Sequence, residues 1–292
     1  MNKILKIDIH AHARPVEELA TDSMLEYTRL LEIYDKMGIE RGGILPFIRM
    51  NKPNGVLSWQ NAKALAEENP DRFFWYTTVD LDKDLHDGKA LADFLAEQRA
   101  LGAKGVGEIT TKLYFDDARV GELFKVAAAL DMPVLFHTAP SFASRYGVVD
   151  DLGLPRLEKM LDAHPKVKYI GHAKAFWSEI SVQTCEADRE RTSKEPVVEG
   201  RLPYLMRKYR NLYCDLSAAS GSNAMMRDRA YAARFLCEFS DRVLYGCDIC
   251  NESSTYPYEF SDFLDGLAAD GSIDADTYYK VCRGNAERLF EL

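Results

Sequence analysis

Eight apolar segments rich in Val, Ile, Tyr and Phe recur along the 292-residue chain. Their length and residue types predict strands, and several are almost continuously apolar, as strands buried on both faces of a parallel sheet are. The predicted strands cover residues 4–13, 42–48, 72–80, 103–109, 133–139, 166–173, 211–218 and 242–248.

The connections between these strands have helical periodicity. Apolar side chains recur at helical spacing between Tyr27 and Tyr34, and Gly38 follows where a helix C-cap glycine belongs. Eight strand–helix alternations without a linker predict one α/β domain over residues 1–292, a (β/α)8 TIM barrel. A doubly wound sheet is the structural competitor, but GVGEI after the fourth strand lacks the glycine spacing of a dinucleotide-binding loop.

One connection differs in composition from the others. Residues 185–201, CEADRERTSKEPVVEGR, are highly charged and follow the sixth predicted strand. Barrel enzymes carry loops that cover the active site at this position. A solvated surface loop is the simpler interpretation, and both stay open.

Overall charge and cysteine usage restrict the class of protein. The chain has 37 basic and 46 acidic residues, a net charge of −9, and no cluster of Lys and Arg that would favour nucleic acid or an anionic membrane. The start, MNKILKIDIH, is too short an apolar run for a signal peptide, and six cysteines follow no secreted-domain pattern. We therefore expect a cytoplasmic protein with a small-molecule partner, and a homo-oligomer stays open.

The segment KIDIHAHARP, residues 6–15, places polar side chains at alternate positions of the first strand: Asp8, His10 and His12. Because side chains of a strand alternate between its faces, His10 and His12 should share one face and bind one ion. Asp8 should lie on that face, deeper in the barrel, as a supporting residue. A single histidine in an apolar strand is more often a hydrogen-bonded core residue, so this segment alone is ambiguous.

Three further polar residues end other strands: His137 the fifth, His172 the sixth and Asp248 the eighth. The C-terminal ends of barrel strands meet at one mouth, and core histidines have no reason to choose that end repeatedly. Neutral imidazoles with a carboxylate suit Zn²⁺ and, less selectively, Fe²⁺, Mn²⁺, Co²⁺ or Ni²⁺. Such an ion lowers the pKa of a bound water to about 7, which indicates hydrolytic chemistry.

These motifs resemble the amidohydrolase superfamily of metal-dependent TIM-barrel enzymes, in particular the amidohydrolase-related branch that includes relatives of aminocarboxymuconate-semialdehyde decarboxylase. The resemblance rests on IDIHAH, PVLFH, GH, YGCD and GNAERLF in that order and spans the chain. It implies that His10, His12, His137 and Asp248 bind a divalent transition metal, with zinc as the expected ion. It also implies that Asp248 exchanges a proton with water and that His172 polarises the substrate or acts as general base.

Two features depart from the pattern of this branch. GCDIC, residues 246–250, replaces the G-S-D-W-P of many members and changes the pocket wall after Asp248. Glu108, at the end of the fourth strand, resembles the bridging ligand of TatD-like deoxyribonuclease members, so two ions are the alternative to the single ion that we expect. Cys247 and Cys250 form a C-x-x-C without a second such motif, and we interpret them as ordinary thiols.

Three residues near the expected mouth are candidates for substrate binding. Lys174 and Trp177 follow His172, and Arg14 follows His12. Cations beside an aromatic ring suit a carboxylate-bearing or ring-containing substrate. Packing of Trp177 against a neighbouring helix is the alternative.

The sequence therefore predicts a metal-dependent hydrolase in which an activated water attacks an amide, ester or lactone-like bond of a small molecule. A metal-dependent decarboxylase of an aromatic or unsaturated carboxylic acid is the alternative, because the same ligands serve both reactions. A non-catalytic metal- or ligand-binding barrel is the third hypothesis. His172 argues against it, since a purely structural ion does not need that residue.

Overall fold

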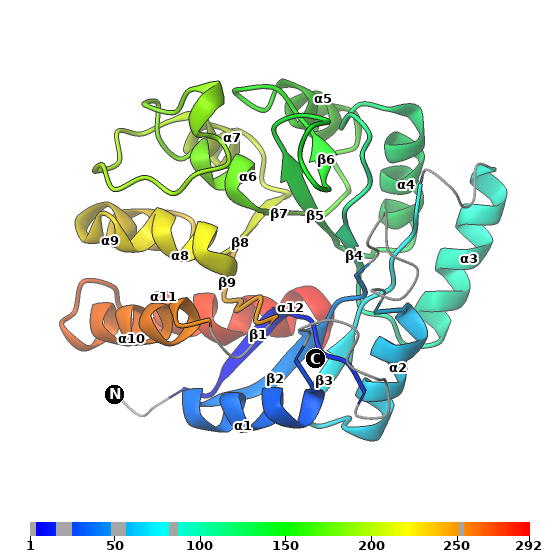
Figure 1. Cartoon of the computed structure of the whole chain (residues 1–292), viewed down its shortest axis with the longest axis horizontal. Coiled ribbons are helices and arrows are strands. Elements are labelled where there is room, and N and C mark those ends of the chain that lie inside the picture. Colours follow the sequence, from blue (N-terminus) through cyan, green and yellow to red (C-terminus); the bar gives the residue numbers. More distant parts are fainter. Residues whose placement is uncertain (1–3, 16–24, 48–56, 82–86, 251–253) are drawn as a thin grey trace.

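The computed structural model describes residues 4–15, 25–47, 57–81, 87–250 and 254–292, and strands alternate with helices through them. The strands lie at the centre with helices around them (Figure 1). The strands are β1 (Lys6–Ala11), β2 (Ile39–Ile44), β3 (Phe73–Trp75), β4 (Val106–Ile109), β5 (Val134–Ala139), β6 (Val148–Val149), β7 (Tyr169–His172), β8 (Leu212–Asp215) and β9 (Val243–Leu244).

Parallel pairing arranges these strands into the predicted barrel. One sheet has the order β1-β2-β3 and the other β4-β5-β7-β8-β9, all parallel. Isolated parallel bridges join the sheets at Thr77 to Val106 and at Ala11 to Ile249. The bridge between Ala11 and Ile249 closes the ring, and we call the contact between β1 and the segment after β9 the seam. Eight parallel strands joined into a ring, with helices between them, form the predicted (β/α)8 TIM-barrel fold.

The observed strands differ from the predicted segments mainly in length. β3 and β9 are shorter than the segments 72–80 and 242–248, and the two-residue β6 pairs with β5 outside the ring. After β9 the backbone leaves regular pairing, and Asp248 adopts a left-handed φ of 51°. The backbone at Asp248 is therefore not held in a strand conformation, and its side chain can point into the mouth of the barrel.

Helices cover the outside of the barrel, and local capping sets where several of them begin. Ser58, Asp87, Asp117 and Asp228 each accept a hydrogen bond from a first-turn N–H, and Gly38 ends α1 at a φ of 70°, as predicted. The helices are α1 (Tyr27–Met37), α2 (Trp59–Glu68), α3 (Gly88–Ala100), α4 (Ala118–Ala129), α5 (Pro155–Ala163), α6 (Lys174–Ser178), η1 (Glu186–Asp188), α7 (Arg201–Lys208), α8 (Ala218–Met226), α9 (Arg229–Glu238), α10 (Tyr256–Ala269), α11 (Ala275–Tyr279), η2 (Lys280–Gly284) and α12 (Asn285–Phe290).

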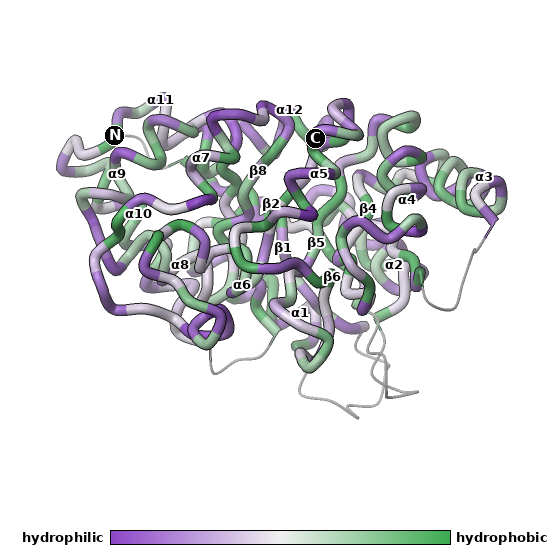
Figure 2. The backbone as a smooth tube through the Cα atoms, turned by 90° about the horizontal axis from the view of Figure 1, so that it is seen from above, coloured by the Kyte–Doolittle hydropathy of each residue, from purple (hydrophilic) through white to green (hydrophobic). Residues whose placement is uncertain are grey.

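The core has an outer layer between strands and helices and a smaller inner cluster. Hydrophobic and hydrophilic stretches alternate along peripheral helices such as α3 (Figure 2), as expected for helices with one buried face. In the inner cluster, Phe290 of α12 packs against Phe74 and Tyr76, with ring centroids 5.2 and 5.4 Å away. Arg283 donates to the carbonyl oxygen of Leu5 (3.0 Å), the residue before β1, so η2 and α12 lie at the N-terminal end of the strands. Apolar packing thus closes the N-terminal end of the barrel. Among the described residues, no helix is long and apolar enough to cross a membrane.

The contacts of Asp8 correct its expected position in the barrel. The pairing of β1 with β2 is irregular between Asp8 and Ala11. Ile9 belongs to the inner cluster, whereas the Asp8 carboxylate accepts a hydrogen bond (2.7 Å) from Tyr34 of the outer helix α1. Asp8 therefore faces the helix layer at α1 rather than the interior of the barrel, where the prediction placed it.

Candidate active site

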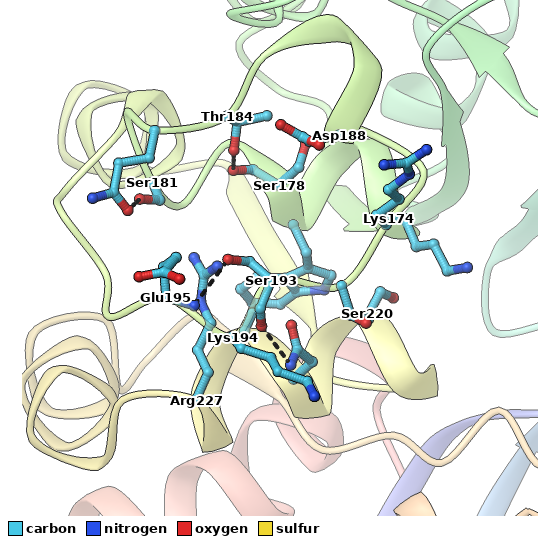
Figure 3. Close-up of a pocket in the computed structure, with 16 residues that line it drawn as sticks. Lys174, Ser178, Ser181, Thr184, Asp188, Ser193, Lys194, Glu195, Ser220 and Arg227 are labelled. Carbon is cyan, nitrogen blue, oxygen red and sulfur yellow. Dashed lines mark hydrogen bonds between the residues drawn. The ribbon is translucent and has the colours of Figure 1, made fainter.

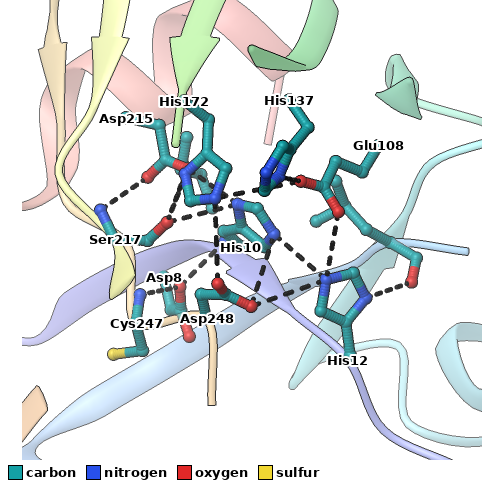
Figure 4. A network of polar contacts seen from close by, with 12 residues as sticks. Asp8, His10, His12, Glu108, His137, His172, Asp215, Ser217, Cys247 and Asp248 are labelled. Carbon is teal, nitrogen blue, oxygen red and sulfur yellow. Dashed lines mark hydrogen bonds and ion pairs between the residues drawn. The ribbon is translucent and has the colours of Figure 1, made fainter. Parts of the chain in front are cut away.

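Polar side chains from six of the barrel strands or their ends meet at the C-terminal mouth (Figure 4). Their burial is unusual for charged and polar groups, which are expected to be paired when they lie inside a protein. They are His10 and His12 from β1, Glu108 from β4, His137 from β5, His172 from β7, Asp215 from β8 and Asp248 after β9.

Two hydrogen bonds fix the imidazoles of His10 and His12. His10 Nδ1 donates to Asp215 Oδ2 (2.7 Å), and His12 Nδ1 donates to the Leu45 carbonyl oxygen (2.9 Å). Because a carboxylate and a carbonyl only accept, each Nδ1 carries the proton. Each neutral ring therefore has a bare lone pair on Nε2.

These lone pairs converge on a third acceptor. The two Nε2 atoms lie 3.1 Å apart, and Asp248 Oδ1 lies 3.6 Å from each. The lone pairs of three such acceptors repel one another, and a cation between them, either a proton or a metal ion, turns the repulsion into attraction. Two imidazoles and a carboxylate are donors that Zn²⁺ and similar ions accept. His10, His12 and Asp248 thus fit a divalent transition ion.

The charges around His10 also favour a cation. Burial alone would lower the pKa of His10, but the carboxylates of Asp248 and Asp215 outweigh it and raise that pKa to about 10. Burial and the neighbouring His10 lower the pKa of His12. This part of the site therefore favours one added positive charge while His12 stays neutral, as a ligand must.

Glu108 lies beside this group and pairs with His137. Its Oε1 accepts a hydrogen bond from His137 Nδ1 (2.7 Å), and its Oε2 lies 3.7 Å from His12 Nε2. Burial would raise the pKa of Glu108, yet His137 holds it well below its usual range. Glu108 forms a second candidate metal group with His10 and His172, whereas His137 joins neither group identified among the described residues. The ligand role of His137 stays a prediction.

Asp215 is the functional residue that the sequence analysis missed. Its Oδ2 accepts hydrogen bonds from His10 and from the Ser217 hydroxyl (2.6 Å), and it lies 3.0 Å from His172 Nδ1 as an ion pair. Burial would raise the pKa of Asp215, but His10 and His172 hold it well below its usual range. One carboxylate thus orients two imidazoles. The sequence contains a signal for this residue. Asp215 ends β8, the seventh strand of the ring, just as Asp248 follows β9, the eighth.

Asp8 supports the site through the backbone. Its Oδ1 accepts from the N–H groups of His10 and Cys247, both at 2.9 Å. The Cys247 thiol is buried, which raises its pKa well above the usual value, and Cys250 Sγ lies 3.3 Å from Asp248 Oδ1. All six cysteines are free. This agrees with the interpretation of Cys247 and Cys250 as thiols.

A cavity of about 390 Å³ lies over the polar cluster and is lined by His137, His172, Lys174 and Asp248, among others. Of the three predicted substrate-binding residues, only Lys174 lines it. Arg14 pairs with Glu26 (2.5 Å). Trp177 is 2% exposed, and its indole N–H donates to the Asp215 carbonyl oxygen (2.9 Å). The structure therefore gives Trp177 a packing role, and its substrate contact, like that of Arg14, stays a prediction.

Sequence comparison identifies the family. The family model described as Amidohydrolase matches residues 7–292. The chain belongs to this amidohydrolase family. The superfamily expected from the motifs is thereby confirmed, and the chain is an enzyme of a metal-dependent family. A search of curated proteins gives no match to this amidohydrolase.

Solved structures share the fold of this amidohydrolase at low sequence identity. An uncharacterized TIM-barrel protein from Bordetella bronchiseptica is 17% identical with a TM-score of 0.67, and 98% of each chain is covered. A probable 2-pyrone-4,6-dicarboxylic acid hydrolase from Acinetobacter baumannii, with citric acid bound, is 15% identical with a TM-score of 0.62, over 99% of this chain and 100% of that chain. A dihydroxybenzoic acid decarboxylase from Polaromonas, with manganese and the inhibitor 2-nitroresorcinol bound, is 19% identical with a TM-score of 0.59, over 98% and 97%.

Proposed function

We propose that this amidohydrolase is a metal-dependent hydrolase that acts on an amide, ester or lactone-like bond of a small molecule. The supporting observation is the convergence of His10 Nε2, His12 Nε2 and Asp248 Oδ1 below a cavity of about 390 Å³. A divalent transition ion bound there, for which we propose zinc, would polarise a carbonyl and lower the pKa of a water to about 7.

We propose that Asp248 and His172 move protons in this reaction. The Asp248 carboxylate lines the cavity, and its Oδ2 lies 3.8 Å from His172 Nε2. Because Asp215 holds the proton on His172 Nδ1, the neutral ring has its lone pair on Nε2. We assign Asp248 to accept the proton of the attacking water and return it to the leaving group. His172 then serves as general base through this lone pair or, in the imidazolium form that Asp215 stabilises, donates to the substrate carbonyl oxygen.

We propose one ion rather than two. Glu108 Oε1 is engaged by His137, and the second candidate group needs His10, which the first group also uses. One imidazole Nε2 has one lone pair and binds one ion. The manganese in the Polaromonas structure makes manganese the first alternative to zinc.

Decarboxylation is the second candidate reaction. The cavity also contains Arg145 and Lys174, whose charges would hold the carboxylate of an acid near Asp248. The structural neighbours include a decarboxylase as well as a probable hydrolase, and the same ligands suit both reactions.

Two measurements test the proposal. Elemental analysis of protein purified without chelator should find about one equivalent of transition metal per chain. Lactones, amides and aromatic acids are then incubated with the enzyme in ¹⁸O-labelled water. Hydrolysis places the label in the product without release of carbon dioxide. Release of carbon dioxide without label in the product would replace the hydrolase by the decarboxylase.

The cellular setting is part of the same proposal. We infer a cytoplasmic enzyme with a small-molecule substrate, and the six free cysteines support a reducing compartment.

A further inference from the structure

Helix α8 connects the catalytic cavity with a second cavity. Ser217, its N-cap, contacts His172, and Arg227 follows its last turn. The second cavity, about 360 Å³, is lined by α8, by α6 and by part of the charged segment 185–201 (Figure 3). Lys174 and Ser220 line both cavities, so the two adjoin.

One face of α8 lines the second cavity. Its lining residues on the helix and its C-cap are Ser220, Asn223, Ala224 and Arg227, which have the spacing i, i+3, i+4 and i+7 of a single helical face. Seven residues at 1.5 Å per residue separate Ser220 from Arg227 by about 10 Å along the axis. Lys174 and Ser220 lie at one end of the cavity, and Arg227 lies at the other (Figure 3).

Two polar atoms of this face have no hydrogen-bond partner within the described part of the chain. They are Ser220 Oγ and Arg227 Nε, and both atoms are buried. Burial also lowers the pKa of the Arg227 guanidinium. A buried donor without an acceptor costs free energy, and an anionic ligand toward which these two side chains turn would supply the acceptor that each lacks.

The charge around these atoms is positive in a protein that is negative overall. Four basic and two acidic side chains line the cavity, whereas the whole chain has a net charge of −9. One of the acids, Asp188, accepts from the Cys185 thiol (2.9 Å). Asn223 donates to the Ser193 carbonyl oxygen (3.0 Å) and so ties the charged segment to α8. The basic side chains are Lys174, Arg191, Lys194 and Arg227.

We propose that this second cavity binds a carboxylate or phosphate at the far end of the substrate, whose reacting bond lies at His172 and Asp248. The substrate is then an elongated anion whose oxyanion reaches past Ser220 to Arg227, about two helical turns further out. The assignment to substrate rests on the proposed function, whereas binding of an anion at Arg227 does not.

Calorimetric titration with glutarate and with inorganic phosphate tests the site. Arg227→Gln should weaken the better of the two probes by about tenfold, because a charged donor is lost. Ser220→Ala should weaken it about threefold. Arg234→Gln removes an exposed arginine of α9 that does not line the cavity, and it should bind like the wild type. Tighter binding of glutarate or of phosphate identifies the oxyanion.

Loss of the metal separates this proposal from the proposed function. His12→Ala should lose the metal but keep wild-type affinity for the probe. If His12→Ala abolishes probe binding while Arg227→Gln leaves it unchanged, the probe binds at the catalytic centre and the second site is refuted. Equal weakening by Arg227→Gln and Arg234→Gln would also refute it, because it would reflect overall charge.

Discussion

The two cavities beside α8 differ in how their polar groups are satisfied. At the catalytic cavity, each imidazole of His10, His12 and His172 has an acceptor for its Nδ1 proton. Of the side chains proposed to bind the oxyanion, Ser220 Oγ, which lines both cavities, and Arg227 Nε have no partner in the described ranges. Chemistry needs side chains that are fixed before the substrate arrives, whereas a recognition site can leave donors for the ligand to complete.

The largest expected effect on activity comes from removing a metal ligand at the catalytic cavity. His12→Ala should lose the bound metal and about 10³-fold in activity, since metal catalysis supplies several kcal/mol. His164→Ala, at the half-buried C-cap of α5, is the matched control and should keep both the bound metal and the activity. Elemental analysis and a rate assay check this, and full metal occupancy in His12→Ala would contradict the assigned ligands.

Removal of the metal should destabilise the wild-type protein. A ligand at 100 times its dissociation constant stabilises the folded state by about 2.7 kcal/mol, so chelation should lower Tm by several degrees. Differential scanning calorimetry with and without chelator measures the shift. The His12→Ala variant should show no shift, and an equal shift in both proteins would mean that the chelator acts elsewhere.

Asp215→Asn tests whether orientation of the rings matters as much as ligation. We expect metal affinity to fall by about 10 to 100-fold, because the carboxylate that holds His10 and His172 is lost. Competition with a coloured chelator measures the affinity. Asp241→Asn, an exposed carboxylate that pairs with Lys280, should leave it unchanged. Unchanged affinity in Asp215→Asn would mean that the rings are held by packing.

Trp177→Phe separates packing from recognition. Loss of the hydrogen bond to the Asp215 carbonyl oxygen should cost about 1 kcal/mol in the free energy of unfolding, with little change in anion binding. Urea unfolding and calorimetric titration measure the two quantities. Weaker anion binding without loss of stability would instead make Trp177 a substrate contact.

The fold and much of the fixed site could be predicted from the sequence because both depend on periodicity. Alternating strands and helices imply a barrel, and a barrel brings strand ends together, so His10, His172 and Asp248 could be placed at one mouth. The same rule applied to the seventh strand would have found Asp215.

Other features leave no periodic signal. The irregular pairing of β1 with β2 and the contact of Asp8 with Tyr34 of α1 both depend on neighbouring elements. The segment 185–201 looks fully solvated by composition, yet Arg189 is buried and donates to the Asp150 carbonyl oxygen (2.8 Å). Arg227 belongs to no motif, and the role proposed for it rests on the cavity that the folded segment forms with α8.

The seam also links metal binding to the integrity of the whole barrel. The backbone of Asp248 donates to the His10 carbonyl oxygen (2.7 Å), and Ala11 pairs with Ile249. His10 and His12 lie on one side of the seam and Asp248 on the other, so a bound ion would cross-link the first and last strands. Such a cross-link would join His10 and His12 to Asp248, which are far apart in the sequence, and it would form and break with metal binding. Removal of the ion should therefore increase the rate of amide hydrogen exchange more in β1 and β9 than in β5.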